Sequence, residues 1–74
     1  MKNIDNILEL FSQRLKELMK EKNLNITKFA DLVNIPRTTV NSWTLGLKFP
    51  RLDYLWKIAD EFGVTIDYLV GREE

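Results

Sequence analysis

A short stretch of this 74-residue chain gathers side chains that can exchange hydrogen bonds with nucleic-acid bases: Arg37, Thr38, Asn41 and Ser42. The apolar residues of the same stretch, Val40 and Trp43, are three positions apart and would share the opposite side of a helix. Arginine can donate two hydrogen bonds to guanine, asparagine can exchange two with adenine, and a threonine methyl can contact thymine. The pattern therefore predicts a face that contacts DNA bases, although a merely solvated polar surface would have the same composition.

Groups that could hold phosphates flank this stretch. The N-terminal amides of a helix suit an anion, and the first turn of this helix, near residues 37–39, would present them. Basic side chains precede and follow the helix. The candidate phosphate contacts are Lys28, Thr39, Lys48 and Arg51. Lys48 has an alternative interpretation, as a loop residue that only improves solubility.

Enzymatic and metal chemistry find little support in the sequence. The chain has no Cys and no His, which excludes a disulfide, a thiol nucleophile, a zinc finger and a histidine general base. Asp60 and Glu61 are neighbours, and a helix points neighbours about 100° apart, so they do not form a catalytic carboxylate pair. Asp53, Asp60 and Asp67 recur every seven residues, but no oxygen-rich loop surrounds them. We expect no catalytic residue, no metal, no cofactor and no small-molecule ligand.

The formal net charge is zero, because 11 Lys and Arg balance 11 Asp and Glu. DNA-binding domains are usually basic, so the total alone argues against a nucleic-acid partner. The distribution of the charges does not. Residues 37–51 carry Arg37, Lys48 and Arg51 and no acid, whereas residues 52–74 carry two basic and six acidic residues. We therefore expect a polarised molecule with modest non-specific affinity for DNA.

Apolar residues recur at spacings of three and four along most of the chain, which is the period of amphipathic helices. They predict an all-α fold of five helices, at about 5–22, 26–33, 37–45, 52–62 and 66–70, in one domain that spans residues 1–74. Asn23 and Gly63 suit left-handed helix ends, and Asn25 and Thr65 can cap the helices that follow them. No segment of useful length alternates with period two, so we expect no strand.

The segment from Ile26 to Leu45 predicts two short helices joined by a tight turn. Ala30 is small enough to let two helices approach closely where they cross, and Asn34 tolerates the positive φ of a sharp bend. Apolar residues on both sides of the bend would share one core: Phe29, Val33, Ile35, Val40 and Trp43. This spacing is typical of a helix-turn-helix.

Three blocks of the sequence resemble the Cro/repressor family of helix-turn-helix proteins, also called the XRE family. They read RLKELMKEKNL, FADLVNIPRTTVNSW and LGLKFPRLDYLWKIADEFGVTIDYLVG, and the resemblance covers roughly residues 11–71. It implies a compact, lambda-repressor-like bundle of five helices whose third helix enters the major groove of double-stranded DNA. It also implies a sequence-specific repressor of the phage or mobile-element type, acting as a homodimer on a two-fold operator.

An alternative function remains open. Ile26, Thr44 and Leu45 stand where the family commonly has polar residues. Their apolar or shortened side chains favour a protein-interaction module with the same fold, such as an antitoxin or an anti-repressor partner. Retention on DNA at low salt would distinguish the two functions.

Aromatic and aliphatic residues near the end of the chain suggest a contact between subunits. Leu52, Trp56 and Tyr68 could form it, because tryptophan and tyrosine are enriched at interfaces. Trp56 could equally be half-buried at the edge of the core. No targeting segment or membrane span is visible, so we expect a cytoplasmic protein. The family resemblance implies a bacterial or phage origin.

Overall fold

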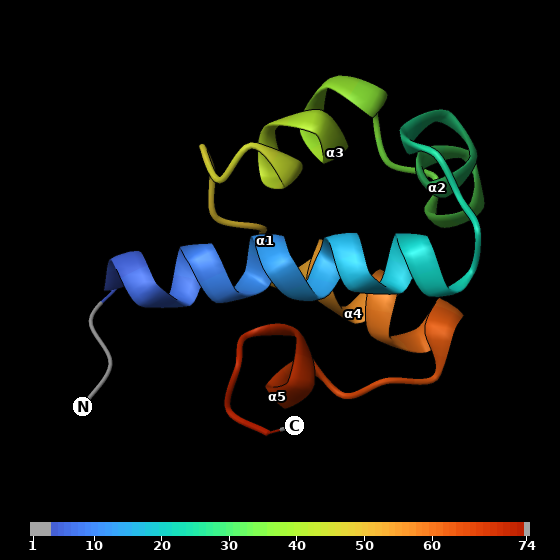
Figure 1. Cartoon of the computed structure of the whole chain (residues 1–74). Helices are drawn as coiled ribbons and strands as arrows, with labels where there is room; N and C mark the ends of the chain where they lie inside the picture. The colour runs from blue at the N-terminus through green and yellow to red at the C-terminus, as the bar shows by residue number, and fades with distance from the viewer. Residues whose placement is uncertain (1–3, 74) are drawn as a thin grey trace.

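The computed structural model describes residues 4–73 and arranges them in five helices (Figure 1). These are α1 (Ile4–Glu21), α2 (Ile26–Val33), α3 (Arg37–Thr44), α4 (Leu52–Phe62) and α5 (Ile66–Leu69). The other described residues form turns and connectors, which confirms the all-α prediction. The predicted bounds of α2 and α4 match, α1 lies one residue earlier than expected, and α3 and α5 each end one residue earlier. Within residues 4–73, no helix combines the length and the apolar character that a membrane crossing requires.

The longest helix, α1, is the centre of the bundle. It crosses the middle of the molecule, with α2 and α3 on one side and α5 on the other (Figure 1). α1 packs against α3 and α5, while α2 packs against α3 and α4. α1 and α2 therefore pack against one side of α3, and the opposite side of α3 faces outward.

Short polar residues fix the helix ends that the sequence predicted. Asn23 follows α1 with a left-handed φ of 56°, and the N–H of Leu24 donates to the carbonyl of Met19 at 2.8 Å. Before α5, the hydroxyl of Thr65 accepts a hydrogen bond from the N–H of Tyr68 at 2.9 Å. Such caps satisfy backbone groups that a helix end leaves without partners.

The core consists of side chains from all five helices. Its largest fully buried members are Trp43, Phe11, Phe29, Leu15, Ile58, Leu69 and Val40. The rings of Phe11 and Trp43 meet edge to face, with centroids 5.6 Å apart, and Phe29 and Phe62 stack at 5.2 Å. These contacts join α1 to α3 and α2 to α4, so the interior is one continuous cluster.

Gly71 lies where the chain that follows α5 passes close to α1. Its φ is +82°, and a Cβ at this position would lie 2.6 Å from Leu10 Cδ1 and 3.0 Å from Leu10 Cβ. Gly63, after α4, has a similar φ of +65°, but a Cβ there would meet open space. Both positions need the backbone freedom of glycine, and only Gly71 also needs its small size.

We expect Gly63→Ala to lower the free energy of unfolding by about 1–2 kcal/mol, the cost of a left-handed alanine. Gly71→Ala has the same backbone cost and should lose roughly 1–3 kcal/mol more, because its methyl group overpacks against Leu10. Urea unfolding followed by circular dichroism measures both variants. Equal losses for the two variants would contradict a tight contact at Gly71.

Candidate nucleic-acid interface

The turn between α2 and α3 has the geometry that its sequence predicted. Asn25 begins α2, and its side chain accepts a hydrogen bond from the N–H of Lys28 at 2.8 Å. Asn34 ends α2 in the left-handed region, with φ 56° and ψ 50°. The N–H of Ile35 then donates to the carbonyl of Ala30 at 3.0 Å, which closes the bend. Ala30 itself is buried, and its small side chain permits this close return of the chain.

α3 starts at once after this bend because proline leads into it. Pro36 has φ −56°, a value that its ring imposes and that suits a helix start. The core holds one side of α3, since Val40 and Trp43 are 0% and 1% exposed. Successive helix residues differ by about 100°, so the opposite side of α3 must point away from the bundle.

Three of the four predicted base contacts lie on this outward side. Arg37, Thr38 and Asn41 are exposed. Ser42 is half-buried, and its hydroxyl donates a 2.6 Å hydrogen bond to the carbonyl of Thr39 within the helix. Ser42 can therefore still accept a hydrogen bond through its oxygen, while its proton already has a partner.

Three of the four predicted phosphate contacts share one hollow. It has a volume of about 220 Å³, and its lining residues are Thr39, Trp43, Lys48, Phe49, Arg51 and Tyr54. The hollow lies between α3, the connector after it and the start of α4. Lys28 is separate from this group, because it lies on α2 beside Leu24 and Asp31. The structure therefore brings together Thr39, Lys48 and Arg51, and leaves Lys28 as an isolated position.

Arg51 already has an anionic partner within the chain. Its Nη2 lies 2.6 Å from Asp53 Oδ2 and its Nε lies 3.1 Å from Asp53 Oδ1, a two-pronged pair. The guanidinium also covers the ring of Tyr54, with Cζ 4.5 Å from the ring centroid. Hydrogen bonds from Arg51 hold the pKa of the Asp53 carboxyl below its ordinary value, and the same bonds raise the pKa of Arg51. An incoming phosphate must therefore compete with Asp53 for Arg51.

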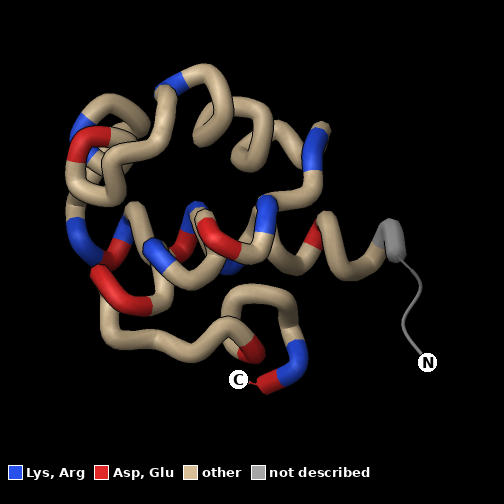
Figure 2. The backbone as a smooth tube through the Cα atoms, turned by 180° about the vertical axis from the view of Figure 1, so that it is seen from behind, with Lys and Arg blue, Asp and Glu red and all other residues tan. Residues whose placement is uncertain are grey.

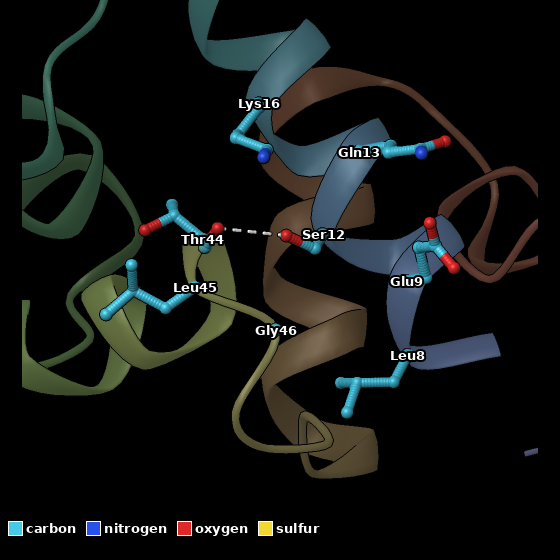
Figure 3. Close-up of a pocket in the computed structure, with 8 residues that line it drawn as sticks. All are labelled: Leu8, Glu9, Ser12, Gln13, Lys16, Thr44, Leu45 and Gly46. Atoms are coloured by element: carbon cyan, nitrogen blue, oxygen red, sulfur yellow. Dashed lines mark hydrogen bonds between the residues drawn. The ribbon is translucent and has the colours of Figure 1, made fainter. Parts of the chain in front are cut away.

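A second hollow, between α1 and the C-terminal end of α3, shows how α1 supports the interface (Figure 3). Its volume is about 430 Å³, and its lining residues are Leu8, Glu9, Ser12, Gln13, Lys16, Thr44, Leu45 and Gly46. The buried hydroxyl of Ser12 donates to the carbonyl of Thr44 at 3.1 Å, which ties the end of α3 to α1. Lys16 borders the end of α3 from α1. The sequence had no local signal for the bond between Ser12 and Thr44, since it joins residues 32 positions apart.

The charges are arranged around the outward side of α3. Figure 2 shows mostly basic positions on the α2–α3 side of the molecule and mostly acidic positions on the opposite side, near the end of α4 and around α5. This separation agrees with the basic residues of 37–51 and the acidic excess of 52–74. A polyanion would therefore approach the side that presents α3.

The residues predicted for a dimer contact differ in their surroundings. Leu52 and Trp56 are 72% and 60% exposed, so Trp56 is not at a half-buried core edge. Tyr68 is half-buried against α1, where the Arg14 guanidinium lies 4.7 Å from its ring centroid. The Tyr68 hydroxyl also donates to Glu17 Oε2 at 3.5 Å. The Tyr68 side chain therefore already contacts Arg14 and Glu17 of the same chain, whereas Leu52 and Trp56 are largely exposed.

Taken together, a capped α2, a left-handed bend at Asn34 and a half-buried α3 define a helix-turn-helix protein. Residues 15–69 match a family model described as helix-turn-helix. The chain belongs to this family, the XRE-type or Cro/repressor group of helix-turn-helix DNA-binding regulators that the sequence resembles.

Known relatives are named as regulators of transcription. The chain is 41% identical over 61 residues to the HTH-type transcriptional regulator AnsR of Bacillus subtilis, covering 82% of this chain and 53% of AnsR. It is 34% identical to the HTH-type transcriptional activator BcrR of Enterococcus faecalis, covering 86% and 31% of the two chains. It is 29% identical to the cryptic phage CTXphi transcriptional repressor RstR of Vibrio cholerae, covering 88% and 59%. The chain thus spans between a third and three fifths of the length of these relatives.

A solved structure agrees with the fold. The crystal structure of a transcriptional regulator from Listeria innocua superposes with a TM-score of 0.77 at 33% sequence identity. The match covers 86% of this chain and 60% of that one. The five-helix bundle is therefore the arrangement found in a regulator of the same class.

Proposed function

We propose that the protein is a sequence-specific DNA-binding repressor whose α3 reads bases in the major groove. The outward side of α3 carries this proposal, because it has no part in the core and presents Arg37, Thr38 and Asn41 to the surroundings. Arg37 suits guanine, Asn41 suits adenine, and Thr38 suits either a hydrogen-bonding edge or a thymine methyl. Ser42 adds an acceptor oxygen at the edge of the same face.

We assign phosphate contacts to the hollow beside α3. Thr39, Lys48 and Arg51 line it together, and a phosphate there would fix the depth and direction of α3 in the groove. Lys28 would contact a second phosphate from the start of α2. The exposed Lys48 is the main cation of the hollow, since Asp53 already pairs with Arg51.

A two-fold operator and a homodimer complete the proposal. A helix-turn-helix monomer contacts only a short half-site, and two half-sites on one face of DNA lie about 34 Å apart or a multiple of that.

We propose repression rather than activation, which the naming of RstR as a phage repressor supports and the naming of BcrR as an activator opposes. We place its action in the cytoplasm. That the chain has no enzymatic activity stays a prediction.

Selection of bound sequences from random double-stranded DNA tests the proposal directly. We expect enrichment of one motif made of two inverted half-sites about 10 base pairs apart, or a multiple of that spacing. Affinity for the motif should fall steeply with salt. If no motif is enriched and the protein passes through a DNA column at low salt, it is a protein-interaction module instead.

The Arg37 side chain should determine one base of the selected motif. We expect Arg37→Ala to weaken binding by roughly 1–3 kcal/mol and to relax the preference at one position of each half-site. Arg72→Ala is the matched control, because it removes another exposed arginine, which follows α5 on the side of the bundle away from α3. Fluorescence anisotropy with single-base variants of the motif measures both. A variant at Arg37 that keeps the full preference would exclude this residue as a base contact.

The Asp53 carboxylate should weaken the contact between the Arg51 guanidinium and a DNA phosphate. Asp53→Asn removes the charge that competes for the guanidinium, so we expect tighter binding and a salt dependence steeper by about one phosphate contact. Asp60→Asn is the control, because it removes the same charge from the same helix without releasing Arg51. If the two variants bind equally well, the gain comes from net charge alone and Arg51 does not contact phosphate.

A further inference from the structure

One exposed apolar side chain lies at the end of the helix that presents the base contacts. Leu45 directly follows α3 and is 61% exposed. Its N–H donates to the carbonyl of Asn41 at 3.1 Å, the bond of a regular helical turn, and its φ and ψ are −89° and −4°. Leu45 therefore continues the path of α3 by one residue beyond the end of the helix.

The Leu45 side chain lies on the same side of α3 as Thr38. Seven residues separate the two positions, which is two helical turns less about 20°. Asn41 lies between them at spacings of three and four, which join neighbours on one helix face. The buried Val40 and Trp43 mark the opposite side, and Figure 3 shows the Leu45 side chain directed away from α1. Leu45 thus extends the outward side of α3.

The chain turns away immediately after Leu45. Gly46 has a left-handed φ of 71°, and its N–H donates to the carbonyl of Trp43 at 3.0 Å. The N–H of Leu47 donates to the carbonyl of Ser42 at 2.9 Å. These two bonds satisfy carbonyl groups that a helix end otherwise leaves without partners. Leu45 is therefore the last side chain on the outward side of α3.

A leucine at this position suits an apolar part of DNA. Its side chain has no donor for a phosphate oxygen or a base edge, and polar groups that it covered would lose water without gaining a hydrogen bond. The base edges in the major groove present one apolar group, the C5 methyl of thymine. Thr38 and Asn41 on the same side can exchange hydrogen bonds with bases, so Leu45 would add an apolar contact to a polar face.

We infer that Leu45 contacts the C5 methyl group of a thymine near one end of each half-site and so specifies that base. The inference rests on the proposed function, because it requires α3 to lie in the major groove. Leu45 is about 10 Å from Thr38 along the helix axis, at 1.5 Å for each residue. Successive bases of a DNA strand are about 3.4 Å apart along its axis, so the thymine is up to about three base steps from the base that Thr38 contacts.

The same observations argue against Leu45 as a docking point for a protein partner. Leu45 stands where the family commonly has a polar residue, which favoured a protein-interaction module on sequence grounds. A protein contact surface needs several apolar side chains together. The neighbours of Leu45 on the outward side of α3 are instead polar: Thr38, Asn41 and Ser42.

Removal of one methyl group from the DNA tests the inference. Deoxyuridine lacks only the C5 methyl of thymidine, so each thymine of one half-site of the selected motif is replaced by uracil in turn, and binding is measured by fluorescence anisotropy. We expect a position near one end of the half-site where this replacement weakens binding roughly 4-fold, the value of one buried methyl group. In a double-mutant cycle, Leu45→Ala should lose this difference between thymine and uracil.

Three control variants should keep the difference at that position. Leu32→Ala removes an exposed leucine from α2, outside α3. Thr38→Ser removes the other methyl group on the outward side of α3 that can contact thymine. Leu45→Met keeps an apolar side chain of similar volume. Circular dichroism verifies that all variants stay folded.

Three results would overturn the inference. The first is a motif in which no thymine responds to uracil, and the second is a uracil effect that Leu45→Ala leaves unchanged. The third is equal weakening of the thymine and uracil forms by Leu45→Ala, which would assign Leu45 to a sugar contact. Each leaves the proposed function intact, because selection of the motif is read separately, whereas failure to select any motif would overturn both.

Discussion

The rest of this structure depends on the packing of the buried Trp43 side chain. Its indole meets the ring of Phe11 at 5.6 Å and the ring of Tyr54 at 5.7 Å, so one side chain joins α3 to α1 and to α4. A helix of eight residues is too short to be stable alone. Packing of Trp43 and Val40 both keeps α3 helical and sets its rotation about its own axis. The direction in which Arg37, Thr38 and Asn41 point is a consequence of that rotation.

Local sequence signals were sufficient for the helices and for the turn. Asn25, Asn34 and Thr65 act through hydrogen bonds or backbone angles within a few residues, so the residue type alone predicted their roles. The exposed side of α3 could also be predicted, because the period of Val40 and Trp43 fixes which residues face outward. These features depend on contacts over one or two turns.

The contacts that sequence reasoning missed depend on the packing of distant elements or on a choice between rotamers. The bond between Ser12 and Thr44 spans 32 positions, and no local pattern indicates it. The pairing of Arg51 with Asp53 needs the connector to place both side chains together at the start of α4. The exposure of Trp56 was undecided because Trp56 lies one step from the apolar side of its helix, where the neighbouring elements determine burial.

The contact between Gly71 and Leu10 has a consequence for the direction in which the chain leaves the bundle. It holds the residues after α5 against the side of α1 opposite to α3, and Figure 1 shows the end of the described chain on that side. A domain or tag that follows the described residues therefore starts from the side of the bundle opposite to α3. A large fusion partner at this end would lie on the side of α1 opposite to α3 and would leave the exposed side of α3 accessible to DNA.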